Sequence, residues 1–179
     1  MEQQMASTLS EICGLLAAQR LPRWQELPDL DLYMDQVLSL IRRYLADYPG
    51  FDDRGLTASM VNNYVKMGVM PPPVKKKYTR GHLAHLIIIC ILKASLPIAS
   101  IQQLIAHELS GHTEEVFYDR FCELFEKSSR ATAAAYPASD AEDPESAPVS
   151  ALCRAALRAQ AEQALALKLS ASIFDTGSL

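Results

Sequence analysis

The chain has 179 residues, of which 49% are hydrophobic, 21% charged and 7% aromatic, so it has enough apolar residues to build a core. Its longest uninterrupted apolar run, residues 86–92, is far shorter than the roughly 20 residues that a membrane-spanning helix needs. The N-terminal residues lack the basic flank of a secretory signal, and the four cysteines are 77, 32 and 31 residues apart. We therefore expect a cytoplasmic protein with reduced thiols, no membrane partner, no metal site and no cofactor.

The net charge of −4 is distributed unevenly along the chain. Residues 54–107 contain seven Lys or Arg and no Asp or Glu, which leaves a net charge of −11 for the rest. A local positive field is typical of modules that bind polyanions. Chance clustering of lysines on a solvated surface is the alternative interpretation.

Residues 1–28 are predicted to form an N-terminal helix and a connection. Thr8 begins a capping box, and apolar residues follow at helical spacing, so we expect a short helix from there to about Gln19. Pro22 and Pro28 then bracket the connection to the next element.

The main domain is predicted at residues 29–127. Its first helix should begin near Asp29 or Asp31, because an acidic residue there precedes an amphipathic apolar pattern. Pro49 and Gly50 should end the helix.

A short second helix should follow Thr57, whose hydroxyl can cap its N-terminus, and should end at Gly68 in a left-handed conformation. Tyr64 lies on the apolar side of this helix and is expected in the core. The opposite side carries four polar residues at i, i+3, i+4 and i+7 spacing: Ser59, Asn62, Asn63 and Lys66.

Three prolines, residues 71–73, exclude a helix and lead into residues 74–78, a short extended hairpin or loop that carries Lys75, Lys76 and Lys77. We expect Tyr78 to anchor this ribbon. A buried apolar helix should then run from Arg80 to about Ala94, since it is apolar on nearly every side.

Two amphipathic helices are predicted after this, one following Pro97 and one capped by Thr113 that reaches about residue 127. Residues 128–150 have the composition of a flexible linker, and residues 151–179 should contain a C-terminal helix. This last helix can fold back on its own core or pair between two chains.

Several segments resemble the mercury-resistance-regulator (MerR) type of DNA-binding domain. The similar segments are residues 63–72, residues 78–83 and the later turn and helix at residues 96–101. Residues 56–66, together with the lysine ribbon, also resemble an uncharacterised bacterial domain-of-unknown-function family with a MerR-like core. The resemblance covers about residues 30–127.

The resemblance implies an all-α fold with a minimal β wing, a MerR-like winged helix-turn-helix plus flanking helices. It implies sequence-specific binding to double-stranded DNA in transcription regulation, with a homodimer as an option. The physical chemistry agrees, because Asn can pair bidentately with adenine in the major groove and lysine can contact phosphates. The expected DNA-binding residues are Ser59, Asn62, Asn63, Lys66, Lys75, Lys76, Lys77 and Arg80.

The sequence gives little support for an enzyme. His107 and His112 are five residues apart, so their imidazoles would sit about 140 degrees apart on a helix and could not close a zinc site. The alternative function is a helical protein-interaction module that keeps the fold without binding DNA. Such a module would engage its partner through its tail helix or through the aromatic face formed by Phe117, Phe121 and Phe125.

Overall fold

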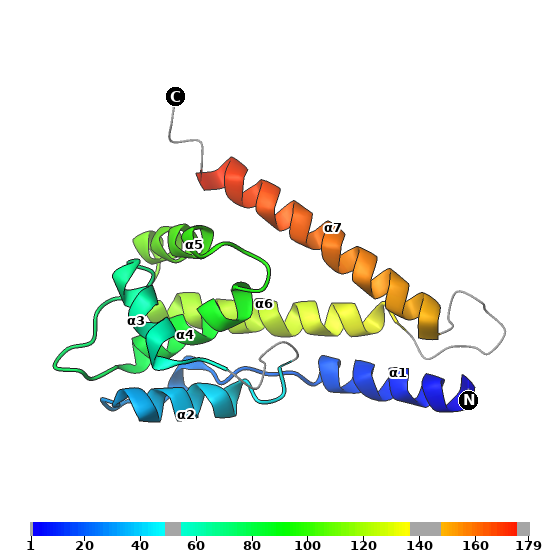
Figure 1. The fold of residues 1–179 in the computed structure, drawn as a ribbon, viewed down its shortest axis with the longest axis horizontal. Helices are drawn as coiled ribbons and strands as arrows, with labels where there is room; N and C mark the ends of the chain where they lie inside the picture. Colours follow the sequence, from blue (N-terminus) through cyan, green and yellow to red (C-terminus); the bar gives the residue numbers. More distant parts are fainter. Residues whose placement is uncertain (1, 49–54, 137–147, 175–179) are drawn as a thin grey trace.

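The computed structural model describes residues 2–48, 55–136 and 148–174, and this part of the chain is almost entirely helical (Figure 1). The helices are α1 (Glu2–Ala17), the 3-10 helix η1 (Trp24–Glu26), α2 (Met34–Tyr44), α3 (Ala58–Lys66), α4 (Arg80–Leu92), α5 (Ile98–Gly111), α6 (Glu114–Ala134) and α7 (Pro148–Phe174). Extended pairing among the described residues is limited to two isolated bridges, Leu32 with Tyr78 and Val74 with Lys77. The predicted all-α class is confirmed. None of these helices is both long and apolar enough to cross a membrane.

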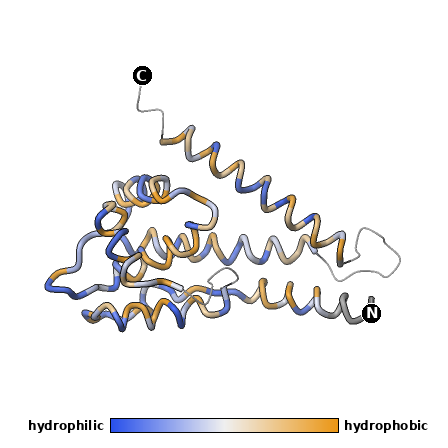
Figure 2. Tube along the Cα trace, in the orientation of Figure 1, coloured by the Kyte–Doolittle hydropathy of each residue, from blue (hydrophilic) through white to orange (hydrophobic). Residues whose placement is uncertain are grey.

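Helix α4 is the centre of the core. All of its residues from Gly81 to Ile91 are buried, and Figure 2 shows it as the most continuously apolar helix of the body. Helices α2, α5 and α6 pack around it. A helix that is apolar all round is stable in water only when it is covered on every side, which explains this arrangement.

The first helix of the main domain begins later than the sequence suggested. Residues Asp29 and Asp31 precede the helix, because Leu32 is held in an extended conformation by backbone hydrogen bonds to Tyr78 in both directions, at 2.9 and 2.8 Å. Helix α2 starts only at Met34. The predicted stop at residues 49–50 lies outside the described residues.

Helices α1 and α6 differ from prediction because they pack against each other. Helix α1 already begins at Glu2, so Thr8 lies inside it and does not cap it. Helix α6 continues to Ala134, past its predicted end at residue 127, and buries Ser129 against the N-terminal region. The two helices lie side by side in opposite directions (Figure 1). Of the predicted linker, residues 137–147 lie outside the described part.

Helix α7 lies against its own chain through sparse contacts with α1 and α5. The Gln163 side chain donates to the Ala94 carbonyl at 3.4 Å, and the rings of His107 and Phe174 are 6.3 Å apart. Most of the described side chains of α7 remain exposed. The helix is therefore attached to the body at a few points only.

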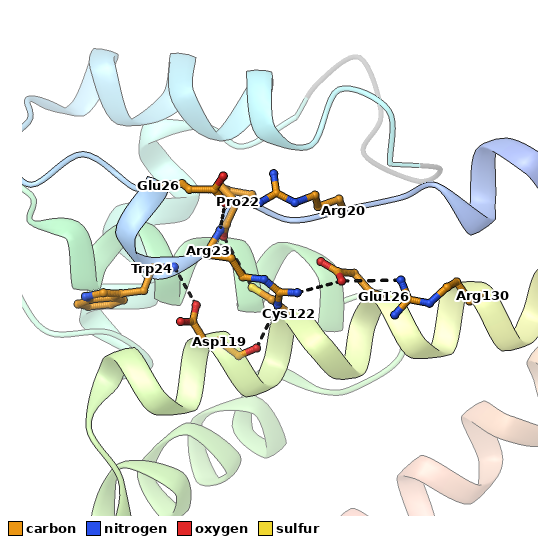
Figure 3. Close-up of polar contacts among 9 residues, drawn as sticks. All are labelled: Arg20, Pro22, Arg23, Trp24, Glu26, Asp119, Cys122, Glu126 and Arg130. Carbon is orange, nitrogen blue, oxygen red and sulfur yellow. Dashed lines mark hydrogen bonds and ion pairs between the residues drawn. The ribbon is translucent and has the colours of Figure 1, made fainter.

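The connection between α1 and α2 is fixed to α6 by a cluster of polar contacts (Figure 3). The Arg23 guanidinium contacts the Glu126 carboxylate at 2.9 Å and donates to the Asp119 carbonyl at 3.3 Å. The Trp24 backbone N–H donates to the Asp119 carboxylate at 2.8 Å. The Glu126 side chain is only 11% exposed, so Arg23 provides its main charge compensation.

Replacement of Arg23 by Ala should therefore lower the free energy of unfolding by about 2 to 3 kcal/mol, because it leaves the Glu126 carboxylate buried without its closest cation. Chemical denaturation followed by circular dichroism would measure the loss. The neighbouring pair of Arg20 and Glu26 is about half exposed, so Arg20→Ala is the matched control and should cost much less. Equal losses in the two variants would contradict this assignment.

Candidate nucleic-acid interface

Helix α3 is anchored to the body by one side and by both ends. Val61 and Tyr64 are buried beneath it, as expected for Tyr64. The Thr57 hydroxyl accepts a hydrogen bond from the Met60 backbone N–H at 3.3 Å, which confirms the predicted cap. At the other end Gly68 has a φ of +70°, and the Gln102 side chain of α5 donates to its carbonyl at 3.3 Å.

The outer side of α3 presents the four polar residues that the sequence singled out. Ser59, Asn62, Asn63 and Lys66 are all exposed and line one shallow, open depression of about 500 Å³. Two methionines also reach this surface. Met60 lines the depression, and Met67 is 43% exposed with its sulfur 3.4 Å from the Asn63 side-chain nitrogen.

The lysine ribbon, residues 74–77, forms a short β-hairpin with a two-residue turn. The backbones of Val74 and Lys77 exchange hydrogen bonds of 3.2 and 2.9 Å across a two-residue tip, Lys75 and Lys76. Both tip residues have positive φ, 51° and 64°, as in a type I′ turn. This turn usually takes Asn-Gly, so two lysines there store strain in the backbone.

The four basic residues that were predicted beside α3 fall into two groups. Lys75 and Lys76 are exposed at the tip, and no described carboxylate forms an ion pair with either. Lys77 instead lies 3.9 Å from the Asp31 carboxylate and over the ring of Tyr33. The fourth residue, Arg80, belongs with Lys77 in the second group, because it also pairs with an acidic residue.

Arg80 is largely committed to contacts within the protein. Its side chain is 15% exposed, lies 3.7 Å from the Asp29 carboxylate and stacks over the ring of Trp24. The cations at the sheltered base of the hairpin therefore hold the α1–α2 connection. The two tip lysines are exposed, and the loop between α3 and α4 that carries them lies at the end of the molecule opposite the N-terminus (Figure 1).

The base of the hairpin rests on His82 of α4. The ring of buried Tyr78 meets the His82 ring edge-on at 5.4 Å, and the Thr79 backbone N–H donates to the His82 Nδ1 at 3.0 Å. Burial lowers the pKa of His82, partly offset by nearby backbone carbonyls of the proline segment. The imidazole is therefore held neutral, with Nδ1 as an acceptor.

This lowered pKa predicts a loss of stability in acid. Below about pH 6.5 the unfolded chain binds a proton at His82 that the folded chain does not bind, so the free energy of unfolding falls as pH drops. His82→Gln keeps an acceptor for Thr79 and should flatten this fall between about pH 7 and pH 5. Denaturation series across that range would measure it. His107 is exposed, so His107→Gln is the control and should leave the pH dependence unchanged.

The side chains that could bind a metal or act as nucleophiles do not cluster in the described part of the chain. Within the described ranges, no three His, Cys, Asp or Glu side chains gather in a way that could hold a metal ion. Burial raises the pKa of Cys90 and of Cys122 to about 11, which keeps both thiols protonated at neutral pH. The predicted site residues thus divide between the exposed polar side of α3, the exposed hairpin tip, and the two cations that pair with Asp29 and Asp31.

Comparison with protein families matches residues 22–125 to a domain of unknown function, DUF1836, and because this match spans more than half of the chain, the protein belongs to that family. The match begins at the connection to α2 and ends within α6, so it includes α3, the hairpin and α4. The resemblance to a domain-of-unknown-function family is confirmed at this level. Searches among curated proteins and among solved structures found no match.

Proposed function

We propose that this protein is a sequence-specific binder of double-stranded DNA that acts in transcription regulation through a MerR-like winged helix-turn-helix. In this proposal α3 enters the major groove and the 74–77 hairpin is the wing. The observation that carries it is an exposed polar helix face together with a strained hairpin tip of two exposed lysines, neither of which forms an ion pair with a described carboxylate.

The first support is the shape of the α3 surface. One side of the helix is buried and the other carries hydroxyl, amide and ammonium groups along one stripe. An α-helix fits the major groove, where Asn62 or Asn63 can bind adenine bidentately. The groups lie on a rigid element, because Val61, Tyr64 and the contact between Gln102 and Gly68 fix its position.

The second support is the distribution of charge. Asp29 and Asp31 compensate Arg80 and Lys77, so these two cations add little to the external field. Lys66 on α3 and the two tip lysines form no ion pair with any described carboxylate. Such uncompensated ammonium groups suit phosphates, and each contact should release counterions.

The third support is the strain at the tip. A non-glycine residue in the left-handed region raises the free energy of the folded state by roughly 1 kcal/mol or more, and here two successive residues adopt that conformation. Asn-Gly would form the same turn with less strain. The presence of lysine at both strained positions therefore favours a function that depends on their charge.

Exchange of the tip tests this directly. Lys75→Asn combined with Lys76→Gly keeps the turn and removes both charges. The free energy of unfolding should therefore rise by about 1 kcal/mol, while DNA affinity falls. The slope of log K against log salt should become shallower by about 1 to 2, since each lost phosphate contact removes roughly 0.9. Fluorescence anisotropy with duplexes selected from a random-sequence pool would measure it.

The matched control is Lys127→Asn, which removes an exposed lysine from the distant surface of α6. It should leave both the affinity and the salt slope unchanged. If the pool contains no duplex bound more tightly than the non-specific range of about 10⁻⁴ to 10⁻⁶ M, the DNA proposal is wrong.

Base recognition by α3 is tested separately. Asn62→Ala and Asn63→Ala should each weaken binding to a selected duplex by about 1 to 3 kcal/mol if the residue reads a base, and should change binding to unrelated duplexes little. Competition anisotropy with both duplexes would separate the two effects. A uniform loss on all duplexes would assign these residues to backbone contacts, contrary to the prediction.

A further inference from the structure

A second surface lies away from α3, where the end of α4 meets α5 and α6. An open apolar pocket of about 380 Å³ lies between these helices. Its apolar walls include Ile91, Leu92, Leu104, Phe117, Phe121 and Phe125. The three phenylalanines are four residues apart on α6, so they stack along one side of that helix. The aromatic face recognised in the sequence is therefore one wall of a pocket.

The pocket has the size and chemistry of a small-ligand site. Sites for small molecules usually have volumes of about 300 to 1,000 Å³, mostly apolar walls and a few polar groups that orient the ligand. Phe117 and Ile91 are almost fully buried in the core, so these walls are rigid. A flexible apolar surface would collapse, whereas these walls are fixed by the packing of α4.

The polar groups at the pocket are arranged around Arg120. The Arg120 Nη1 lies 3.1 Å from the His112 Nε2, and because a guanidinium only donates, His112 accepts there. The imidazole then carries its hydrogen on Nδ1, which faces the Glu108 backbone carbonyl at 3.2 Å and its carboxylate at 3.6 Å. His112 thus donates to the Glu108 backbone carbonyl, and the Glu108 carboxylate lies beside both His112 and Arg120.

Arg120 itself retains unused donors. Its Nη1 lies 3.9 Å from the Glu108 carboxylate, an ion-pair distance that is too long for a hydrogen bond, and its side chain is 56% exposed. A guanidinium has five N–H donors and prefers a planar carboxylate. Because the Arg120 guanidinium lies beside an apolar cavity, it can bind the anionic head group of a ligand whose apolar part fills the cavity.

We propose that this pocket binds a small monocarboxylic acid with an apolar body, its carboxylate on Arg120 and its body between Leu104 and the phenylalanines. The Glu108 carboxylate at the same mouth disfavours a second negative charge on the ligand. This site shares no residue with the α3 surface or the hairpin, so the inference does not depend on DNA binding.

Octanoate and 1-octanol are suitable probes, because they share an apolar chain and differ in the head group. Isothermal titration of the full chain should show saturable binding of octanoate with one site per chain. Arg120→Gln should weaken octanoate binding about tenfold and change octanol binding less than twofold. The control is Arg130→Gln, because Arg130 is 59% exposed on the same helix but lies outside the pocket. It should leave both affinities unchanged.

A second variant tests the apolar body. Leu104→Trp places a larger side chain into the open cavity and should abolish binding of both probes, while circular dichroism and thermal melting confirm that the chain still folds. The proposal is wrong if octanoate shows no saturable binding, if Arg120→Gln and Arg130→Gln behave alike, or if Leu104→Trp binds octanoate normally. It is also wrong if neither probe binds and Leu104→Trp converts a dimer to a monomer in sedimentation, because the face is then an interface between copies.

Discussion

The burial of α4 is the constraint on which the rest of the structure depends. A helix with no polar side must exclude water along its whole circumference, and three other helices are needed to do so. Its N-terminus emerges from this enclosure at Arg80, and there the Thr79 backbone N–H and hydroxyl both contact the His82 Nδ1. The hairpin is built on this end of the helix. Its orientation therefore follows from the core, although its tip is entirely in solvent.

The positive charge of the molecule is divided by the same construction. Acidic residues from the segment before α2 reach the hairpin base because Leu32 pairs with Tyr78. This pairing places Asp31 beside Lys77 and Asp29 beside Arg80. The hairpin belongs to a segment without acidic residues, but acidic residues from another segment neutralise the cations at its base. Only the hairpin tip stays positively charged. Net charge along the sequence overstates the number of free cations.

The sequence predicts well those features that local chemistry determines. The Thr57 cap, the glycine end at Gly68 and the enclosure of α4 each follow from a few adjacent residues, and each is present. The start of α2 and the end of α6 were wrong because contacts with distant segments decide them: the Leu32 bridge in one case and packing on α1 in the other.

The candidate surfaces show the same division. The polar stripe of α3 was visible as a spacing, whereas a turn of two left-handed lysines has no sequence signal, since Asn or Gly usually marks that turn. The loss of Arg80 and Lys77 to internal ion pairs also required partners about fifty residues away in the chain. The phenylalanine spacing was visible, but Ile91 and Leu104, which turn a face into a cavity, come from other helices.

Helix α5 contributes a side chain to each of two separate surfaces. Leu104 of α5 lines the apolar cavity, and Gln102, about 200 degrees away around the same helix, holds the carbonyl of Gly68 at the end of α3. A short helix moves as a rigid rod, so a displacement of Leu104 also displaces Gln102. Any change that displaces α5 at the cavity would therefore also displace the contact that holds the end of α3.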